Sequence, residues 1–67
     1  MKVSLKALRV NSGFSQNDVA KRIGVTKNTV GNWEKGITSM DIDKLMKICD
    51  LYGCNINDID LKKSKLN

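Results

Sequence analysis

The segment KNTVGNWEK, residues 27–35, carries short amides and lysines at spacings that place them on one side of a helix. At about 100° per residue these residues span an arc of about 140°. The residues of this arc are Lys27, Asn28, Gly31, Asn32 and Lys35. An asparagine amide can bind an adenine edge with two hydrogen bonds, and a lysine ammonium suits guanine or a phosphate. Val30 and Trp33 fall on the opposite side, where they can pack against a core.

We predict that Lys27, Asn28, Gly31 and Asn32 contact base edges. Phosphate contacts are predicted for polar residues around them, namely Gln16, Asn17, Thr29, Lys35, Thr38 and Ser39. Gln16 and Asn17 open a helix, where free backbone N–H groups and the helix dipole favour an anion. A mid-helix glycine costs about 1 kcal/mol relative to alanine, so Gly31 either allows close approach of a base or backbone or is neutral drift. For the polar residues, the alternative is an ordinary solvated face.

Catalytic and metal-binding chemistry is not supported by the residue types. The chain has no histidine and two cysteines, Cys49 and Cys54, whereas a zinc site needs about four ligands, usually Cys and His. The carboxylates are scattered, and no nucleophile–base set is recognisable. We therefore predict no enzyme activity, no cofactor and no metal. Two small core thiols are favoured for the cysteines over a disulfide or redox pair.

The positive charge is unevenly distributed along the chain. The 67 residues carry a net charge of +5. Residues 1–37 hold seven Lys and Arg against two acidic residues, whereas residues 38–67 hold five of each kind. A basic half of this kind favours a polyanionic partner, which includes DNA, RNA and an acidic membrane surface.

Apolar periodicity predicts an all-helical domain with five helices, at about 4–11, 16–23, 27–35, 42–52 and 56–61. The N-cap candidates are Ser15, Thr26, Asp41 and Asn55, with capping boxes expected for Ser15–Asp18 and Asn55–Asp58. The core predicted from these faces consists of Leu5, Leu8, Phe14, Val19, Ala20, Ile23, Val25, Val30, Trp33, Ile42, Leu45, Ile48, Cys49, Tyr52, Cys54, Ile56 and Ile59. One domain is expected over residues 1–61, followed by a short flexible basic tail over 62–67.

The connection between the second and third helices is very short, no longer than residues 24–26. So short a loop headed by glycine forces the two helices to cross sharply. A sharp crossing needs a small side chain where the backbones approach, and Ala20 lies one turn before Gly24. Val25 fills the corner, and Val30 and Trp33 anchor the third helix. Together these positions match the helix-turn-helix pattern.

The stretch LKALRVNSGFSQNDVAKRIGVTKNTVGNWEKG, continued by DIDKLMKICDLYGC and NINDI, resembles the lambda-repressor/Cro superfamily, also called the Xre-type helix-turn-helix family. The resemblance runs from about Leu5 to Ile59. It implies a five-helix, usually dimeric DNA-binding domain that acts as a transcriptional regulator. It also implies a partly buried ion pair between Arg9 and Glu34, a structural role that we favour over direct readout for both. Met40 departs from the family, which often has proline there.

The sequence therefore predicts a sequence-specific transcriptional regulator, a repressor of the Cro-like phage or small stand-alone Xre type. The major groove of B-DNA admits a helix, whereas the deep, narrow groove of RNA does not. A homodimer would bind a double-stranded operator whose two-fold related half-sites lie about 34 Å apart. The expected dimer surface comprises Ile56, Ile59, Leu61 and Leu66. The alternative is a protein-interaction module, or an antitoxin or controller subunit, without its own specific DNA readout.

Unpaired thiols and the lack of a signal peptide or membrane span in the sequence predict a cytoplasmic protein. When bound to DNA, it would be associated with the nucleoid.

Overall fold

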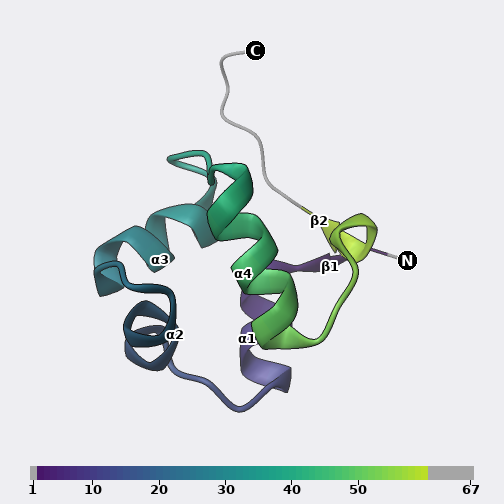
Figure 1. Cartoon of the computed structure of the whole chain (residues 1–67), viewed down its shortest axis with the longest axis horizontal. Coiled ribbons are helices and arrows are strands. Elements are labelled where there is room, and N and C mark those ends of the chain that lie inside the picture. Colours follow the sequence, from purple (N-terminus) through teal and green to yellow (C-terminus); the bar gives the residue numbers. More distant parts are fainter. Residues whose placement is uncertain (1, 61–67) are drawn as a thin grey trace.

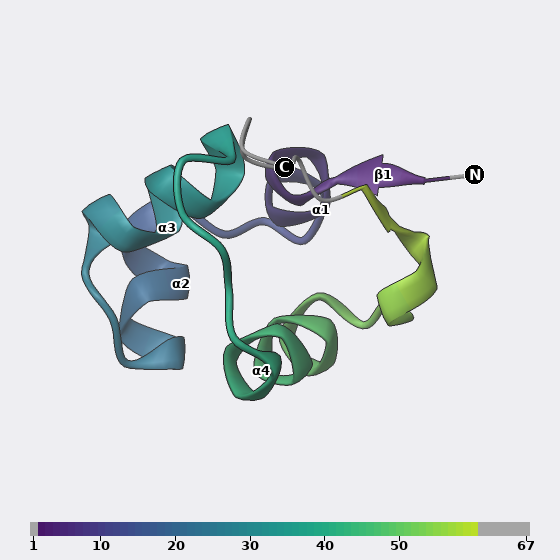
Figure 2. The ribbon, with the colours of Figure 1, turned by 90° about the horizontal axis from the view of Figure 1, so that it is seen from above.

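The computed structural model describes residues 2–60. Along the chain its elements are β1 (Val3–Ser4), α1 (Leu5–Asn11), α2 (Gln16–Ile23), α3 (Lys27–Lys35), α4 (Ile42–Tyr52), the 3-10 turn η1 (Ile56–Asp58) and β2 (Ile59–Asp60). Helices α2 and α3 lie at one end of the molecule and the strands at the other, with α1 and α4 between them (Figure 1, Figure 2). The first four predicted helices are confirmed.

The predicted fifth helix, over residues 56–61, is wrong. In its place the chain forms η1 and then β2, which pairs in parallel with β1 through Val3 to Ile59 and Ser4 to Asp60. The expected Asn55–Asp58 capping box is also not formed, because the Asn55 side chain accepts from the backbone N–H of Asn57 instead. This bond spans two residues and stabilises a turn in competition with an α-helix. The domain is therefore mostly helical, with a small strand pair that closes it.

The other predicted helix starts are confirmed by their hydrogen bonds. Ser15 and Asp18 form a reciprocal capping box, with the two bonds at 2.9 and 3.0 Å. The side chains of Thr26 and Asp41 accept from backbone N–H groups of the first turns of α3 and α4. The bond from Ser15 lowers the pKa of Asp18, because it stabilises the ionised carboxylate. These caps set the starts of α2, α3 and α4.

The core lies between the four helices and β2, and most of its predicted members are confirmed. Val19, Val30 and Ile48 are almost completely buried. Two predicted members are wrong: Ile42 is 60% exposed and Ile56 is 41% exposed. Ile42 is the first residue of α4, at its outer end, and the buried face of that helix begins only at Leu45.

The exposure of Ile56 follows from the short 3-10 turn in which it lies. That turn does not continue an α-helical face, and the buried isoleucine of this region is Ile59, on β2. Cys49 and Cys54 are free, half-buried thiols packed against the core, as predicted.

The predicted domain boundary at residue 61 and the tail over 62–67 lie outside the described residues. Within residues 2–60, no helix is long and apolar enough to cross a membrane.

Candidate nucleic-acid interface

A sharp corner joins α2 to α3. Gly24 adopts the left-handed conformation, with φ of 89°, and its N–H donates to the carbonyl of Ala20 at 2.8 Å. The N–H of Val25 donates to the same carbonyl at 2.9 Å. Ala20 is buried and Val25 is packed against the core. The sequence prediction of a helix-turn-helix corner is thus confirmed in its geometry.

The outer face of α3 is largely open to solvent within residues 2–60. Lys27, Asn28 and Lys35 are exposed, and Gly31 and Asn32 are half-exposed. On the other side of the helix, Val30 and Trp33 are buried, at 2% and 7% exposure. The predicted arc therefore exists as a surface, and it presents two amides and two ammonium groups to solvent. Base contacts by these residues stay a prediction.

A polar network behind this face ties α3 to α1 and α2. The Nε of Arg9 donates to Oε2 of Glu34 at 2.7 Å, and its Nη2 donates to Oε1 at 3.3 Å. Its Nη1 donates to the carbonyl of Phe14 at 3.0 Å. The carboxylate accepts a further bond from Nε2 of Gln16 at 3.0 Å. The ion pair expected between helices one and three is confirmed.

The network is largely shielded from solvent. The side chains of Arg9 and Glu34 are only 11% and 6% exposed. The hydrogen bond to Glu34 raises the pKa of Arg9 above its usual value, against the opposing effect of burial. Three of the four bonds link residues that are 18 or 25 positions apart in sequence. Helix α3 is therefore tied to α1 and to the first residue of α2 by contacts outside the helix-turn-helix corner.

Gln16, a predicted phosphate contact, also connects α2 to α3, a role that was not predicted from the sequence. Its side-chain amide is held by Glu34 and lies beside Gly31, where an added Cβ would meet Nε2 at 3.6 Å. This is ordinary van der Waals contact, so α2 leaves room for an alanine at this position. Asn17, the other predicted contact at the start of α2, is exposed.

Several other predicted phosphate contacts are brought together beside α3. A hollow of about 350 Å³ is lined by Val25, Thr29, Asn32, Trp33, Thr38, Ser39, Asp41 and Lys44. Two hydroxyls from the loop after α3 thus lie near one hydroxyl and one amide of α3. The Thr29 hydroxyl is hydrogen-bonded to that of Thr26, at 2.9 Å. Lys35 does not line this hollow.

Lys44 is a candidate phosphate contact that the sequence reasoning missed. Lys44 lines the hollow, and its ammonium lies 3.8 Å from the carboxylate of Asp41 in a loose, solvent-exposed ion pair. The negative charge of Asp41 weakens the attraction of the hollow for an anion, and the positive charge of Lys44 compensates for it. The available signal was the position of Lys44 in the first turn of α4, three residues after the Asp41 cap and five residues after Ser39.

The predicted dimer surface is only partly supported by burial. Ile59 is 3% exposed, so its assignment to a surface that contacts a second copy is wrong. It faces the core because β2 pairs with β1. Ile56 is 41% exposed and stays available. Leu61 and Leu66 lie outside the described residues.

Comparison with known proteins agrees with this geometry. A family model described as helix-turn-helix matches residues 5–59. The "Uncharacterized HTH-type transcriptional regulator YgzD" of Bacillus subtilis is 34% identical over 59 residues, which cover 88% of this chain and 89% of that protein. A protein of Saccharolobus islandicus named as an HTH-type transcriptional regulatory protein is 36% identical over 52 residues. That match covers 78% of this chain but only 17% of the Saccharolobus protein.

A solved structure shows the same fold. The solution structure of the SOS-response transcriptional repressor LexA from Eubacterium rectale superposes with a TM-score of 0.75 and 32% sequence identity. The match covers 94% of this chain and 66% of that one. The sequence relatives are named as regulators of transcription, which is not a class of enzyme, and the solved structure is named as a transcriptional repressor. The chain belongs to the Xre/Cro-like helix-turn-helix family of transcriptional regulators.

Proposed function

We propose that this chain is a sequence-specific repressor of the small Cro-like kind, which binds double-stranded DNA and reads the major groove with α3. The observation that carries the proposal is the two-sided character of α3: its amides and ammonium groups are exposed while Val30 and Trp33 are buried. A helix fits the major groove of B-DNA, and in this motif the residues near its N-terminus meet base edges. Lys27 and Asn28 are the first two residues of α3.

The roles within α3 follow from side-chain chemistry. Asn28 is assigned to an adenine edge and Lys27 to a guanine edge or a phosphate. Asn32, one turn further along, reaches the next base. The hollow formed by Thr38, Ser39 and Lys44 is assigned to a backbone phosphate, because hydroxyl and ammonium groups are typical phosphate donors.

Selection of bound duplexes from a random pool tests the proposal. We expect one enriched sequence, bound at least about 10³-fold more tightly than unrelated DNA. Asn28→Ala should relax the preference at one base pair, at a cost of about 1–3 kcal/mol for the preferred base. The matched control is Asn57→Ala, because Asn57 is an exposed asparagine on η1, outside α3. Absence of enrichment, or equal loss on all sequences from Asn28→Ala, would contradict specific readout.

We also propose that the protein binds as a homodimer to two half-sites about 34 Å apart. Ile56 supports this, because it is an apolar side chain left exposed on η1, directly before β2. Ile56→Asp should reduce dimer formation on a selected operator in sedimentation, whereas Ile42→Asp, an equally apolar exposed position on α4, should not. A dimer that survives Ile56→Asp would rule out this surface.

A further inference from the structure

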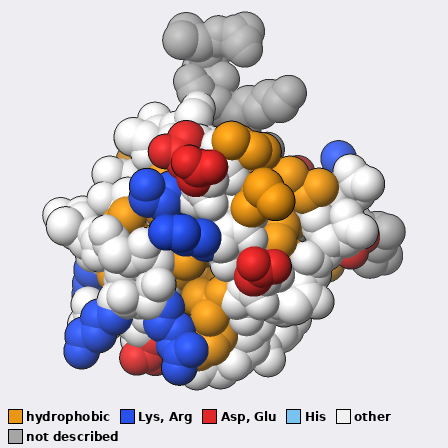
Figure 3. Space-filling model, in the orientation of Figure 1, with side chains coloured by type: hydrophobic (Ala, Val, Ile, Leu, Met, Phe, Trp, Pro, Cys, Tyr) orange, Lys and Arg blue, Asp and Glu red, His pale blue; other side chains and the backbone are white. Residues whose placement is uncertain are grey.

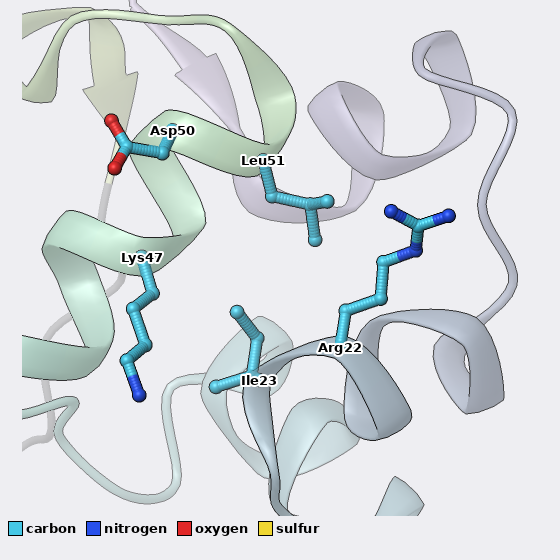
Figure 4. Close-up of a pocket in the computed structure, with 5 residues that line it drawn as sticks. All are labelled: Arg22, Ile23, Lys47, Asp50 and Leu51. Carbon is cyan, nitrogen blue, oxygen red and sulfur yellow. The ribbon is translucent and has the colours of Figure 1, made fainter.

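A second surface hollow lies between α2 and α4, away from the arc of α3. It has a volume of about 490 Å³ and is lined by Arg22, Ile23, Lys47, Asp50 and Leu51 (Figure 4). It shares no lining residue with the arc or with the hollow that contains Lys44. Figure 3 shows apolar side chains on this face of the molecule, with basic side chains beside them. The assigned DNA contacts use none of these residues.

The lining combines an aliphatic floor with a cationic rim. Ile23 and Leu51 line the hollow from α2 and α4, and the Leu51 side chain extends toward Arg22 (Figure 4). Arg22 and Lys47 supply a positive charge from each helix, against the single carboxylate of Asp50. Among residues 2–60, neither cation lies within ion-pair distance of a carboxylate. The rim therefore has a net positive charge that the described chain does not neutralise by direct contact.

Arg22 is held in place by an aromatic stack. Its guanidinium carbon lies 5.1 Å from the centre of the Phe14 ring, and that ring stacks on Tyr52 at a centroid distance of 6.5 Å. This is a cation–π contact, and among residues 2–60 the Arg22 guanidinium makes no ion pair. An arginine that is positioned in this way loses less conformational freedom when it binds a carboxylate with two hydrogen bonds.

We propose that this hollow, here called the α2/α4 hollow and lined by residues 22, 23, 47, 50 and 51, docks an acidic peptide segment of a partner protein. The segment would place an aliphatic side chain on Ile23 and Leu51 and carboxylates against Arg22 and Lys47. A DNA phosphate would satisfy the cations but would gain nothing from the aliphatic floor. A hollow open to solvent suits an extended segment of a partner protein better than a fully enclosed small molecule.

NMR titration of the isotope-labelled full chain with short unlabelled peptides tests the proposal. The probes are acetylated Glu-Glu-X-Glu-Glu peptides with Leu, Ile or Val at the centre, and the controls are Glu-Glu-Ser-Glu-Glu and Gln-Gln-Leu-Gln-Gln. We expect an acidic aliphatic peptide to shift the backbone amides of Ile23, Lys47 and Leu51, and to bind more tightly than both controls. Failure of every acidic aliphatic peptide to bind, or shifts confined to α3, would overturn the proposal.

Paired substitutions of equal charge separate this site from general attraction of acidic peptides to a basic protein. Arg22→Gln with Lys47→Gln should weaken peptide binding about tenfold, since each exposed charge pair contributes modestly. Lys6→Gln with Lys21→Gln removes the same charge from exposed positions outside the hollow and should change binding less than twofold. Equal weakening by both pairs would overturn the proposal.

The salt dependence of duplex binding tests the competing assignment to DNA. The slope of log K against log salt is negative. If Arg22 and Lys47 contact phosphates, their double substitution will reduce the magnitude of this slope by about two. We expect no change in that slope beyond the effect of the Lys6 and Lys21 control. A drop of about two relative to this control would overturn the peptide assignment, whereas an unchanged slope with weakened peptide binding supports it.

Discussion

Breaking the Arg9–Glu34 pair should unfold much of the protein under mild conditions. Arg9→Met removes three hydrogen bonds and leaves a carboxylate whose side chain is 6% exposed, with only Gln16 as its remaining partner. Loss of one member of a buried pair costs about 3–5 kcal/mol. The whole stability expected for a chain of 67 residues is about 3–10 kcal/mol. The substitution should therefore remove a large share of it.

Urea denaturation measured by fluorescence gives a direct assay, because Trp33 is the single tryptophan and is buried on α3. The double variant Arg9→Met with Glu34→Met leaves no unpaired charge in the core. We expect it to be more stable than either single variant, with a coupling energy of about 2–3 kcal/mol. Lys6→Met, an exposed position on the same helix, serves as the control and should change stability by less than about 0.5 kcal/mol.

A loss of less than about 1 kcal/mol in Arg9→Met would refute this reasoning, because that is the range of an exposed surface pair. Additive single effects in the double variant would refute it as well. Either result would mean that α3 is oriented by apolar packing alone, and that the polar network follows from the fold without fixing it.

Three further predictions concern single positions. Gly31→Ala should raise the free energy of unfolding by about 0.5–1 kcal/mol, because the added Cβ meets Gln16 at 3.6 Å without a clash; a lower stability in urea would contradict this. Lys44→Gln should reduce the magnitude of the slope of log K against log salt for DNA binding by about one. An unchanged slope would exclude Lys44 from the phosphate contacts. Burial raises the pKa of Tyr52 from 10.0 to about 12. The neutral phenol therefore stabilises the fold fully below pH 10, and this contribution is lost as the pH rises toward about 12. Absorbance titration of this single tyrosine should show a midpoint well above 10, and Tyr52→Phe should lose less stability over that interval.

The helices and their caps could be predicted because their signals are local. Ser15, Thr26 and Asp41 each satisfy an N–H a few residues away, and Gly24 adopts the left-handed conformation that a tight corner requires. The strand pair could not be predicted in this way. Each strand has two residues, which is too short for alternation to be visible, and its partner lies more than 50 positions away in sequence.

In the candidate site too, features with local sequence signals could be predicted, whereas contacts between distant residues could not. The outward arc of α3 follows from helical periodicity, so its exposed residues were found from the sequence. Contacts across the fold were not found by periodicity. The bond from Gln16 to Glu34 and the position of Lys44 beside Thr38 depend on how α2, α3 and α4 pack. Ile42 and Ile56 failed as core residues for the same reason, since their apolar character alone did not show where packing ends.

The Arg9–Glu34–Gln16 network has a consequence for how the proposed DNA-reading surface can change. Glu34 lies on α3 next to the outward arc, yet its partners come from α1 and from the first residue of α2. A substitution on the arc, such as Asn28 or Asn32, touches none of these bonds. Substitution of Glu34 disturbs both connections at once. The fold thus separates residues that are free to change specificity from residues that must stay fixed to hold α3 in place, although both kinds occur on one nine-residue helix.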